Sequence, residues 1–295
     1  MLIPLKSGDK VAVVATAKRL ERSIEPGLEV LKNWGLEVVL APNVEKHSEY
    51  FAASDEARLS DLHWALDSPE IRAIIFARGG YGTTRILDQV DFSKFRANPK
   101  WTVGFSDLTS FLLHTNSLGI PAIHGPMAYT LGQDSVSDDN LKDLLFGQSQ
   151  FEIELPLNEF TKPGIVEGEI TGGNLSLIYE SIGAANEVQT EGKILFLEEI
   201  GEDFYSVDRM LNKLRRIGKL QNLMGVIIGD FSNVRDSNGY FTRSLNELIY
   251  SYFQHISGPV LFGYPGGHER RNIPLFFNQR ARIEVLTESI LIQYL

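Results

Sequence analysis

The chain has 295 residues, of which 38 are acidic and 28 basic, so its formal net charge is -10. Its composition is 43% hydrophobic and 22% charged, as in globular proteins, and its length allows two domains. The acidic balance argues against nucleic acid or an anionic membrane as a partner. The absence of cysteine excludes thiol catalysis, disulfides and thiolate metal sites.

No apolar run approaches the ~18 residues of a membrane span. The first ten residues turn polar too quickly for a secretory signal peptide. We therefore expect a cytoplasmic protein.

The first part of the chain alternates short apolar strands with amphipathic helices. Strands are predicted over 10–15, 36–40 and 71–76, and helices over 21–34 and from Ser54 onward. This alternation is typical of a parallel sheet covered on both faces. The predicted fold class is α/β, with an N-terminal parallel-sheet domain and a smaller C-terminal α/β domain.

A glycine-rich turn follows the strand over 71–76. Its sequence is Arg78-Gly-Gly-Tyr-Gly82, and three glycines within four positions let a ligand approach the backbone closely. The spacing matches neither a dinucleotide fingerprint nor a P-loop. An anion-binding or oxyanion turn is favoured over a nucleotide loop, and a plain turn is an equal alternative.

A serine stands where the next strand changes into a helix. The strand is predicted over 101–104 and the helix from Thr109, which leaves Ser106 on a very tight turn. That geometry is typical of a nucleophile elbow, with the helix N-terminus available to stabilise an oxyanion. The alternative is that Ser106 or Asp107 simply caps the helix.

The remaining elements suggest a second domain. A strand ending near His124 and a helix over 138–145 precede a looser, proline-containing section, so we predict domains of 1–155 and 156–295. The later elements are strands over 193–197, 224–229 and 259–262, helices over 203–217 and 245–256, and a hairpin of 282–285 with 290–295.

Six histidines could be the general base that a serine nucleophile needs. Four are set aside for their places in helices or in a polar stretch: His47, His63, His114 and His255. His124 and His268 each follow a strand. We favour His268, because it follows two glycines in a loop from which an imidazole could reach another domain.

Two adjacent glutamates could orient the base. Glu198 and Glu199 follow the apolar strand over 193–197, and strand alternation points one toward a cleft and the other away. Glycoside chemistry needs a carboxylate spacing that sequence cannot show, and no metal-binding spacing is present. The alternative is that both are solvated residues at a strand end.

Taken together, six motifs resemble the LD-carboxypeptidase family of serine peptidases, the muramoyltetrapeptide carboxypeptidases. They are Arg78-Gly-Gly-Tyr-Gly82, Gly104-Phe-Ser-Asp-Leu-Thr109, His124-Gly-Pro-Met127, Gly172-Gly-Asn-Leu175, Leu197-Glu-Glu-Ile-Gly201 and Gly263-Tyr-Pro-Gly-Gly-His268. They span most of the chain in order. The family's Ala-Pro-Ser turn after the first strand is replaced here by Ala15-Thr-Ala17.

The resemblance implies a catalytic triad of Ser106, Glu198 and His268, lying between the two domains. It implies an oxyanion hole built from the backbone N–H groups of Asp107 and Gly80. It also implies a homodimer, with neither metal nor cofactor.

The resemblance further implies the substrate. The family cleaves the amide bond between a diamino acid and the terminal D-alanine of murein tetrapeptides, in peptidoglycan recycling. A terminal carboxylate favours a cation, so Arg78 is the first candidate and Arg270 or Arg271 the second, with Tyr81 as a further contact. Ordinary ion pairing is an equal alternative for the arginines.

Three other functions are alternatives to this activity. The family also includes microcin C immunity proteins, which hydrolyse amide bonds of aminoacyl-nucleotide toxins, and this is the alternative activity. A non-catalytic binding module is disfavoured because all three triad residue types are present. An α/β-hydrolase is disfavoured because Leu108 stands where G-x-S-x-G has glycine.

Overall fold

The computed structural model describes residues 2–156, 158–286 and 288–295. The chain divides into two compact units. Unit 1 comprises Met1–Gln148 and Arg270–Phe276, and unit 2 comprises Ser149–Glu269 and Phe277–Leu295. The division therefore differs from the predicted ranges of 1–155 and 156–295, because a short late segment returns to unit 1.

The return of 270–276 to unit 1 depends on tertiary contacts. The N–H of Asn272 donates to the hydroxyl of Ser137 at 2.8 Å. The ring of Phe276 packs on that of Trp101, with centroids 5.0 Å apart. Contacts between residues more than 100 positions apart leave no local trace in composition.

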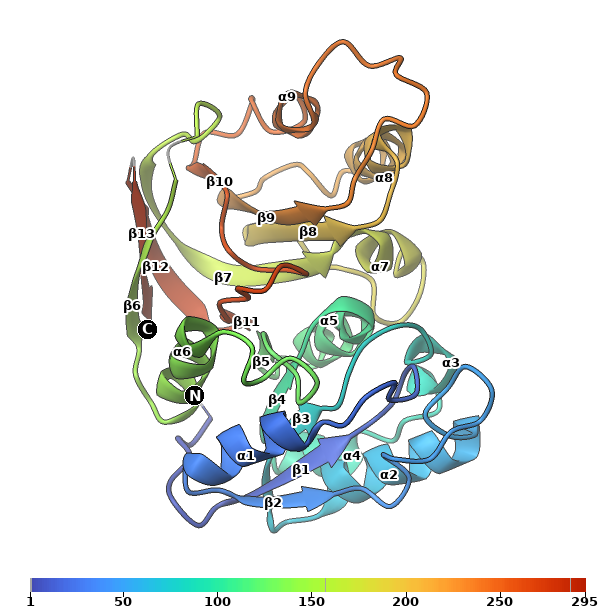
Figure 1. The fold of residues 1–295 in the computed structure, drawn as a ribbon. Helices are drawn as coiled ribbons and strands as arrows, with labels where there is room; N and C mark the ends of the chain where they lie inside the picture. The colour runs from blue at the N-terminus through green and yellow to red at the C-terminus, as the bar shows by residue number, and fades with distance from the viewer. Residues whose placement is uncertain (1, 157, 287) are drawn as a thin grey trace. The chain divides into compact units, whose positions relative to one another are not determined.

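Unit 1 contains a parallel sheet with strand order β2-β1-β3-β4-β5 (Figure 1). Its elements are β1 (Lys10–Val14), α1 (Glu25–Asn33), β2 (Glu37–Leu40), α2 (Asp55–Asp67), β3 (Ile71–Phe76), α3 (Thr84–Leu87), α4 (Ser93–Ala97), β4 (Trp101–Gly104), the 3-10 turn η1 (Ser106–Leu108), α5 (Thr109–Ser117), β5 (Ala122–His124) and α6 (Ser135–Leu145). The α/β class predicted from strand and helix alternation is confirmed.

Local sequence explains these elements well. The residues of β4 are all buried, as expected for a strand covered on both faces. Helix α2 begins after Ser54, whose side chain accepts from the N–H of Ala57 at 3.3 Å. Helix α1 carries a proline in its first turn, where the missing N–H costs nothing.

Unit 2 contains a second parallel set with order β10-β9-β8-β7. Its elements are β6 (Gln150–Glu154), β7 (Gly164–Asn174), α7 (Leu175–Glu180), β8 (Ile194–Ile200), α8 (Phe204–Arg216), β9 (Gly225–Ser232), α9 (Leu245–Tyr250), β10 (Val260–Phe262), β12 (Arg280–Val285) and β13 (Ser289–Tyr294). Strand β11 (Leu275–Phe277) spans the division between the units and pairs Phe277 with Ile170 of β7.

An antiparallel branch extends from β7. The first half of β7 pairs with β12. Strand β12 also pairs with β13, and β13 pairs in turn with β6. The predicted C-terminal hairpin is thus confirmed as β12 and β13. Strand β7 escaped prediction because it is glycine-rich, yet a Cβ on Gly172 would lie 1.9 Å from the carbonyl oxygen of Phe196, so close packing requires glycine there.

Helix α9 is shorter than predicted, and helix α1 begins at Glu25 rather than at the predicted residue 21. Helix α9 ends at Tyr250, whereas the periodicity predicts a helix to residue 256. The hydroxyl of Ser251 donates to the carbonyl of Leu248 at 2.6 Å and competes with helical bonding, and tighter turns follow. None of the helices in the described ranges combines the length and the hydrophobicity that a membrane-spanning helix requires.

Candidate active site

Ser106 lies in unit 1 on a strained turn between β4 and α5. Its φ is +62°, a left-handed conformation that non-glycine residues rarely adopt. Such strain costs about 1–3 kcal/mol and clusters at functional sites. A Cβ on Gly104 would lie 2.9 Å from that of Leu108, so the strand enters the turn too closely for a larger residue. This is the geometry expected of a nucleophile elbow.

The glycine-rich turn after β3 lies against Ser106. A Cβ on Gly79 would be 2.9 Å from the Ser106 Cβ and 3.4 Å from the Asp107 nitrogen. A Cβ on Gly80, whose φ is +115°, would instead meet the Cβ of Lys18 at 2.4 Å. Gly79 is therefore the glycine whose α-carbon faces the serine, and the role predicted for the N–H of Gly80 remains a prediction.

Two buried polar side chains hold the glycine-rich turn. Arg58 has no exposed surface, and its Nη1 donates to the carbonyl of Gly82 at 2.8 Å and to that of Thr16. Asp107 accepts from the N–H of Thr83 at 2.9 Å. Burial raises the pKa of Asp107, although the hydrogen bonds from Thr83 oppose that change. The Asp107 carboxyl thus ties the two turns together.

Arg78, the first candidate for the substrate carboxylate, is engaged within unit 1. Its Nη1 donates to Glu21 at 3.1 Å and to the carbonyl of Arg19 at 3.0 Å. Its guanidinium lies over the ring of Tyr129 at 4.7 Å. Only 15% of its side chain is exposed, so a substrate would have to share or replace the Glu21 pairing.

The other predicted substrate contacts also lie in unit 1. Arg270 donates to the carbonyl of Gln133 at 2.7 Å. Arg271 lies 3.4 Å from Asp134 and keeps 52% of its side chain exposed. Tyr81 is half exposed, with its ring 5.9 Å from that of Phe51.

Glu198 and His268 form a hydrogen-bonded pair in unit 2. The Nδ1 of His268 lies 2.8 Å from Oε2 of Glu198, which is fully buried near the end of β8. A carboxylate can only accept, so Nδ1 carries the proton and Nε2 is the basic nitrogen. Burial lowers the pKa of His268, but the bond to Glu198 and the charges of Glu198, Glu199 and Asp230 outweigh it, so the net pKa is raised.

Glu199 serves a different purpose. Its Oε2 accepts from the N–H and hydroxyl of Ser176 at 2.8 and 2.6 Å, and its Oε1 accepts from Asn174 at 3.0 Å. Burial raises its pKa against these hydrogen bonds. The alternative that both glutamates are solvated is wrong, because Glu198 and Glu199 are 0% and 2% exposed.

The structure adds one residue that the sequence patterns did not indicate. Asp230, near the end of β9, has a pKa raised to about 6, chiefly by burial and also by the charges of Glu269 and Glu198. Its only signal in the sequence is a glycine–aspartate pair at a strand end. By contrast, His124 is fully buried at the end of β5, with its ring 5.8 Å from that of Phe105.

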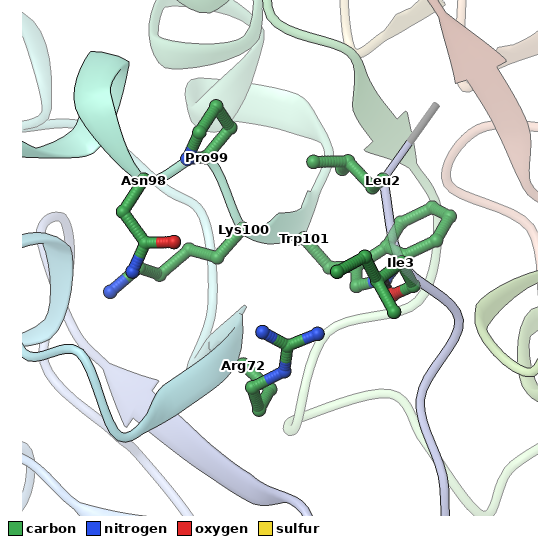
Figure 2. Close-up of a pocket in the computed structure, with 7 residues that line it drawn as sticks. All are labelled: Leu2, Ile3, Arg72, Asn98, Pro99, Lys100 and Trp101. Carbon is green, nitrogen blue, oxygen red and sulfur yellow. Dashed lines mark hydrogen bonds between the residues drawn. The ribbon is translucent and has the colours of Figure 1, made fainter.

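A cavity of about 210 Å³ lies where β4 begins, whereas Ser106 follows the end of that strand (Figure 2). Lys100 lines it, but the ammonium donates to the carbonyls of Ser68 and Ala65 at 2.6 and 3.1 Å, around the C-terminus of α2. Burial lowers the pKa of Lys100 to about 8. Ser106 follows the other end of β4, so this cavity is separate from the candidate chemistry.

Across the described ranges, no group of three or more acidic or histidine side chains could hold a metal ion.

Comparisons with known proteins identify the family of this chain. Residues 11–125 match the LD-carboxypeptidase N-terminal domain family, and residues 167–283 match its C-terminal domain family. A probable murein peptide carboxypeptidase from Bacillus subtilis is 35% identical over 98% of this chain and 93% of its own. The crystal structure of muramoyltetrapeptide carboxypeptidase from Oxalobacter formigenes has a TM-score of 0.86 at 28% identity, covering 97% of this chain and 98% of its own.

The fold is shared more widely. The structure of MccF in complex with glutamyl sulfamoyl guanosine has a TM-score of 0.88 and covers all of this chain and 98% of its own. Its identity is 20%, so the likeness concerns the fold alone.

Proposed function

Because this chain belongs to the LD-carboxypeptidase family, we propose that it is a serine carboxypeptidase acting on murein tetrapeptides, in which Ser106, His268 and Glu198 form the triad. The observation that carries the proposal is the Glu198–His268 hydrogen bond, which prepares Nε2 as a base. The strained backbone of Ser106 and the names of its relatives support it.

In the proposed mechanism, Nε2 of His268 takes the Ser106 proton while Ser106 attacks the carbonyl of the diamino acid residue. Glu198 supports the imidazolium that forms. The imidazolium then protonates the leaving amine, and D-alanine departs from an acyl-enzyme. Water attacks the acyl-enzyme with His268 as base and restores Ser106.

The proposed oxyanion hole uses the backbone N–H of Asp107 together with the glycine-rich turn. The turn supports this role because Gly79 packs on Ser106 and Arg58 holds the Gly82 carbonyl. Donors fixed before the reaction stabilise the developing charge without reorganisation. Gly80 remains the proposed second donor, since its N–H follows directly on Gly79.

For the terminal carboxylate of the substrate, Arg78 remains the proposed partner. Losing a charge-assisted hydrogen bond costs about 1.5–3 kcal/mol. Arg78→Ala should therefore lower kcat/KM for a free tetrapeptide more than for its C-terminal amide. If the wild-type protein and Arg78→Ala show the same preference for the free tetrapeptide over its amide, Arg271 becomes the better candidate because its side chain is half exposed.

The decisive experiment is an assay of D-alanine release from purified murein tetrapeptide. The wild-type protein should release D-alanine, and folded Ser106→Ala should not. A parallel assay with glutamyl sulfamoyl guanosine tests the microcin-immunity alternative. Hydrolysis of the nucleoside compound without D-alanine release would replace the murein assignment by that alternative.

A further inference from the structure

A β-bulge places an aspartate opposite the triad glutamate. Leu197 of β8 pairs with Ile228 of β9, and Glu199 pairs with Phe231. Glu198 alone therefore faces two residues of β9, Gly229 and Asp230. Bulges are over-represented beside active sites, where they redirect a side chain.

The carboxyl of Asp230 shares its surroundings with Glu198. A Cβ built on Gly267, whose φ is +144°, would lie 3.1 Å from Oε2 of Glu198 and 3.3 Å from Oδ2 of Asp230. Both oxygens thus border the residue immediately before His268. Asp230 Oδ2 is buried and accepts no hydrogen bond within the described residues.

The loop that carries His268 is bound along the end of β9. The N–H of Tyr264 donates to the Ile228 carbonyl at 3.1 Å, and the N–H of Asp230 donates to that of Gly266 at 2.9 Å. Past the histidine, the backbone of Glu269 supplies a hydrogen bond to the Asp230 carboxyl. Asp230 therefore holds the loop on both sides of His268.

We propose that Asp230 is a positioning residue for His268: it fixes the histidine loop from both sides and adds a further negative charge that supports the imidazolium. This rests on the proposed function only in taking His268 as the general base. The Glu198 bond orients the ring, and Asp230 determines where the loop presents it.

The charged groups acting on His268 within unit 2 are few. Glu198 and Glu199 come from β8, Asp230 comes from β9, and all three favour the imidazolium. Glu269, on the histidine loop, acts on Asp230 by raising its pKa, and its own carboxyl accepts from Ser232 at 2.6 Å. With a pKa of about 6, Asp230 is ionised at neutral pH and loses its charge as the pH falls through that value.

The test is Asp230→Asn, since asparagine keeps an acceptor for the Glu269 backbone but removes the charge. NMR titration of ¹³C-labelled histidine, with His268 assigned from the His268→Gln spectrum, should show a midpoint lower by about half a pH unit or more. The acid limb of kcat/KM should move the same way, because neutral His268 then persists to lower pH. Asp230→Glu should restore much of the wild-type midpoint.

Asp203→Asn is the matched control, because it removes a unit 2 carboxylate that acts on Ser237 rather than on His268. It should leave the His268 midpoint unchanged. An unchanged midpoint in folded Asp230→Asn would overturn the proposal. If that variant does not fold, the wild-type protein decides: the Asp230 carboxyl carbon and the His268 ring must each show an inflection where the other titrates, and independent curves overturn it.

The NMR result stands apart from peptidase activity. A shifted midpoint in a protein that releases no D-alanine would retain the Asp230 inference and remove the proposed function.

Discussion

The backbone of Ser106 is strained in the folded protein. Its left-handed backbone is a conformation that glycine adopts with little penalty and serine adopts at a cost. The surrounding contacts over-determine it, since Gly79 and Gly104 allow the chain to pack directly on the turn. This strained backbone supports the proposal that Ser106 is the nucleophile.

Replacing Ser106 by alanine should lower the rate of D-alanine release by a factor of about 10⁴ or more, because no acyl-enzyme can form. Ser106→Gly should be equally inactive yet more stable than Ser106→Ala by about 1 kcal/mol, since glycine relieves the strain. Urea unfolding of the two variants checks this. A folded Ser106→Ala protein that kept a tenth of the activity would rule out Ser106 as nucleophile.

Substitutions of the two adjacent glutamates should have different effects on activity and on stability. Glu198→Gln removes the charge behind His268 and should lower kcat by about 10³-fold or more with little change in fold. Glu199→Gln should keep kcat within a few-fold but lower the free energy of unfolding by about 1–2 kcal/mol, because it disturbs the bonds to Ser176 and Asn174. Kinetics and urea unfolding of both variants provide the comparison, and a reversed pattern would exchange their roles.

At the scale of elements, turns of unit 1 are held by side chains from distant elements. Helix α2 contributes Arg58, which bonds to carbonyls near β1 and in the glycine-rich turn. The 3-10 turn contributes Asp107, which bonds to Thr83 at the start of α3. The candidate oxyanion turn is therefore rigid because α2 and η1 hold it.

Arg58→Met should cost about 3 kcal/mol or more in stability, because it removes the buried side-chain donor to the carbonyls of Thr16 and Gly82 and one of the two arginines that pair with Asp55. The control is Arg85→Met, since Arg85 also pairs with Asp55 and also lies over Phe51 but is 44% exposed. It should cost about 1 kcal/mol or less. Equal losses in urea unfolding would show that the carbonyl bonds of Arg58 contribute little.

At the scale of the whole molecule, chain order and compact units do not coincide. Unit 1 includes residues 270–276, which follow most of unit 2 in sequence. Fragment 1–148 therefore lacks the Phe276 ring and the Asn272 N–H. We expect Trp101, which is 3% exposed in the intact chain, to become partly exposed in the fragment.

Fluorescence tests this expectation. The fragment should show a red-shifted tryptophan emission and quenching by iodide, relative to the same fragment with 270–276 joined by a flexible linker. Identical spectra for the two proteins would mean that unit 1 folds without the returning segment.

Buried carboxyls should also make stability depend on pH. Burial raises the pKa of Asp138 to about 6, above its usual value, so the folded state holds this proton more tightly than the unfolded state. Stability from this group is present at low pH and is lost as the pH rises toward and through 6. The free energy of unfolding of Asp138→Asn, relative to that of wild type, should therefore be higher at pH 7.5 than at pH 4.5. Urea unfolding at both values checks the sign, and a constant difference would contradict it.

Elements with local signals could be predicted from the sequence alone. Apolar runs predicted β1, β3 and β4, Ser54 predicted the start of α2, and the tight turn singled out Ser106. The spacing of motifs determined the family, because it depends only on residue order. These features follow from backbone conformation and burial within a few residues of one another.

Features that depend on residues far apart in the sequence are visible only in the folded structure. It showed the hydrogen bond between Glu198 and His268, which the family resemblance implied but no local pattern distinguishes from a bond to Glu199, because β8 and the loop after β10 meet only in the fold. It revealed Asp230, whose place depends on an extra residue in β9 opposite Glu198. It also returned 270–276 to unit 1. A register shift or a long-range packing contact is set by pairing energies across the fold, and no local pattern carries them.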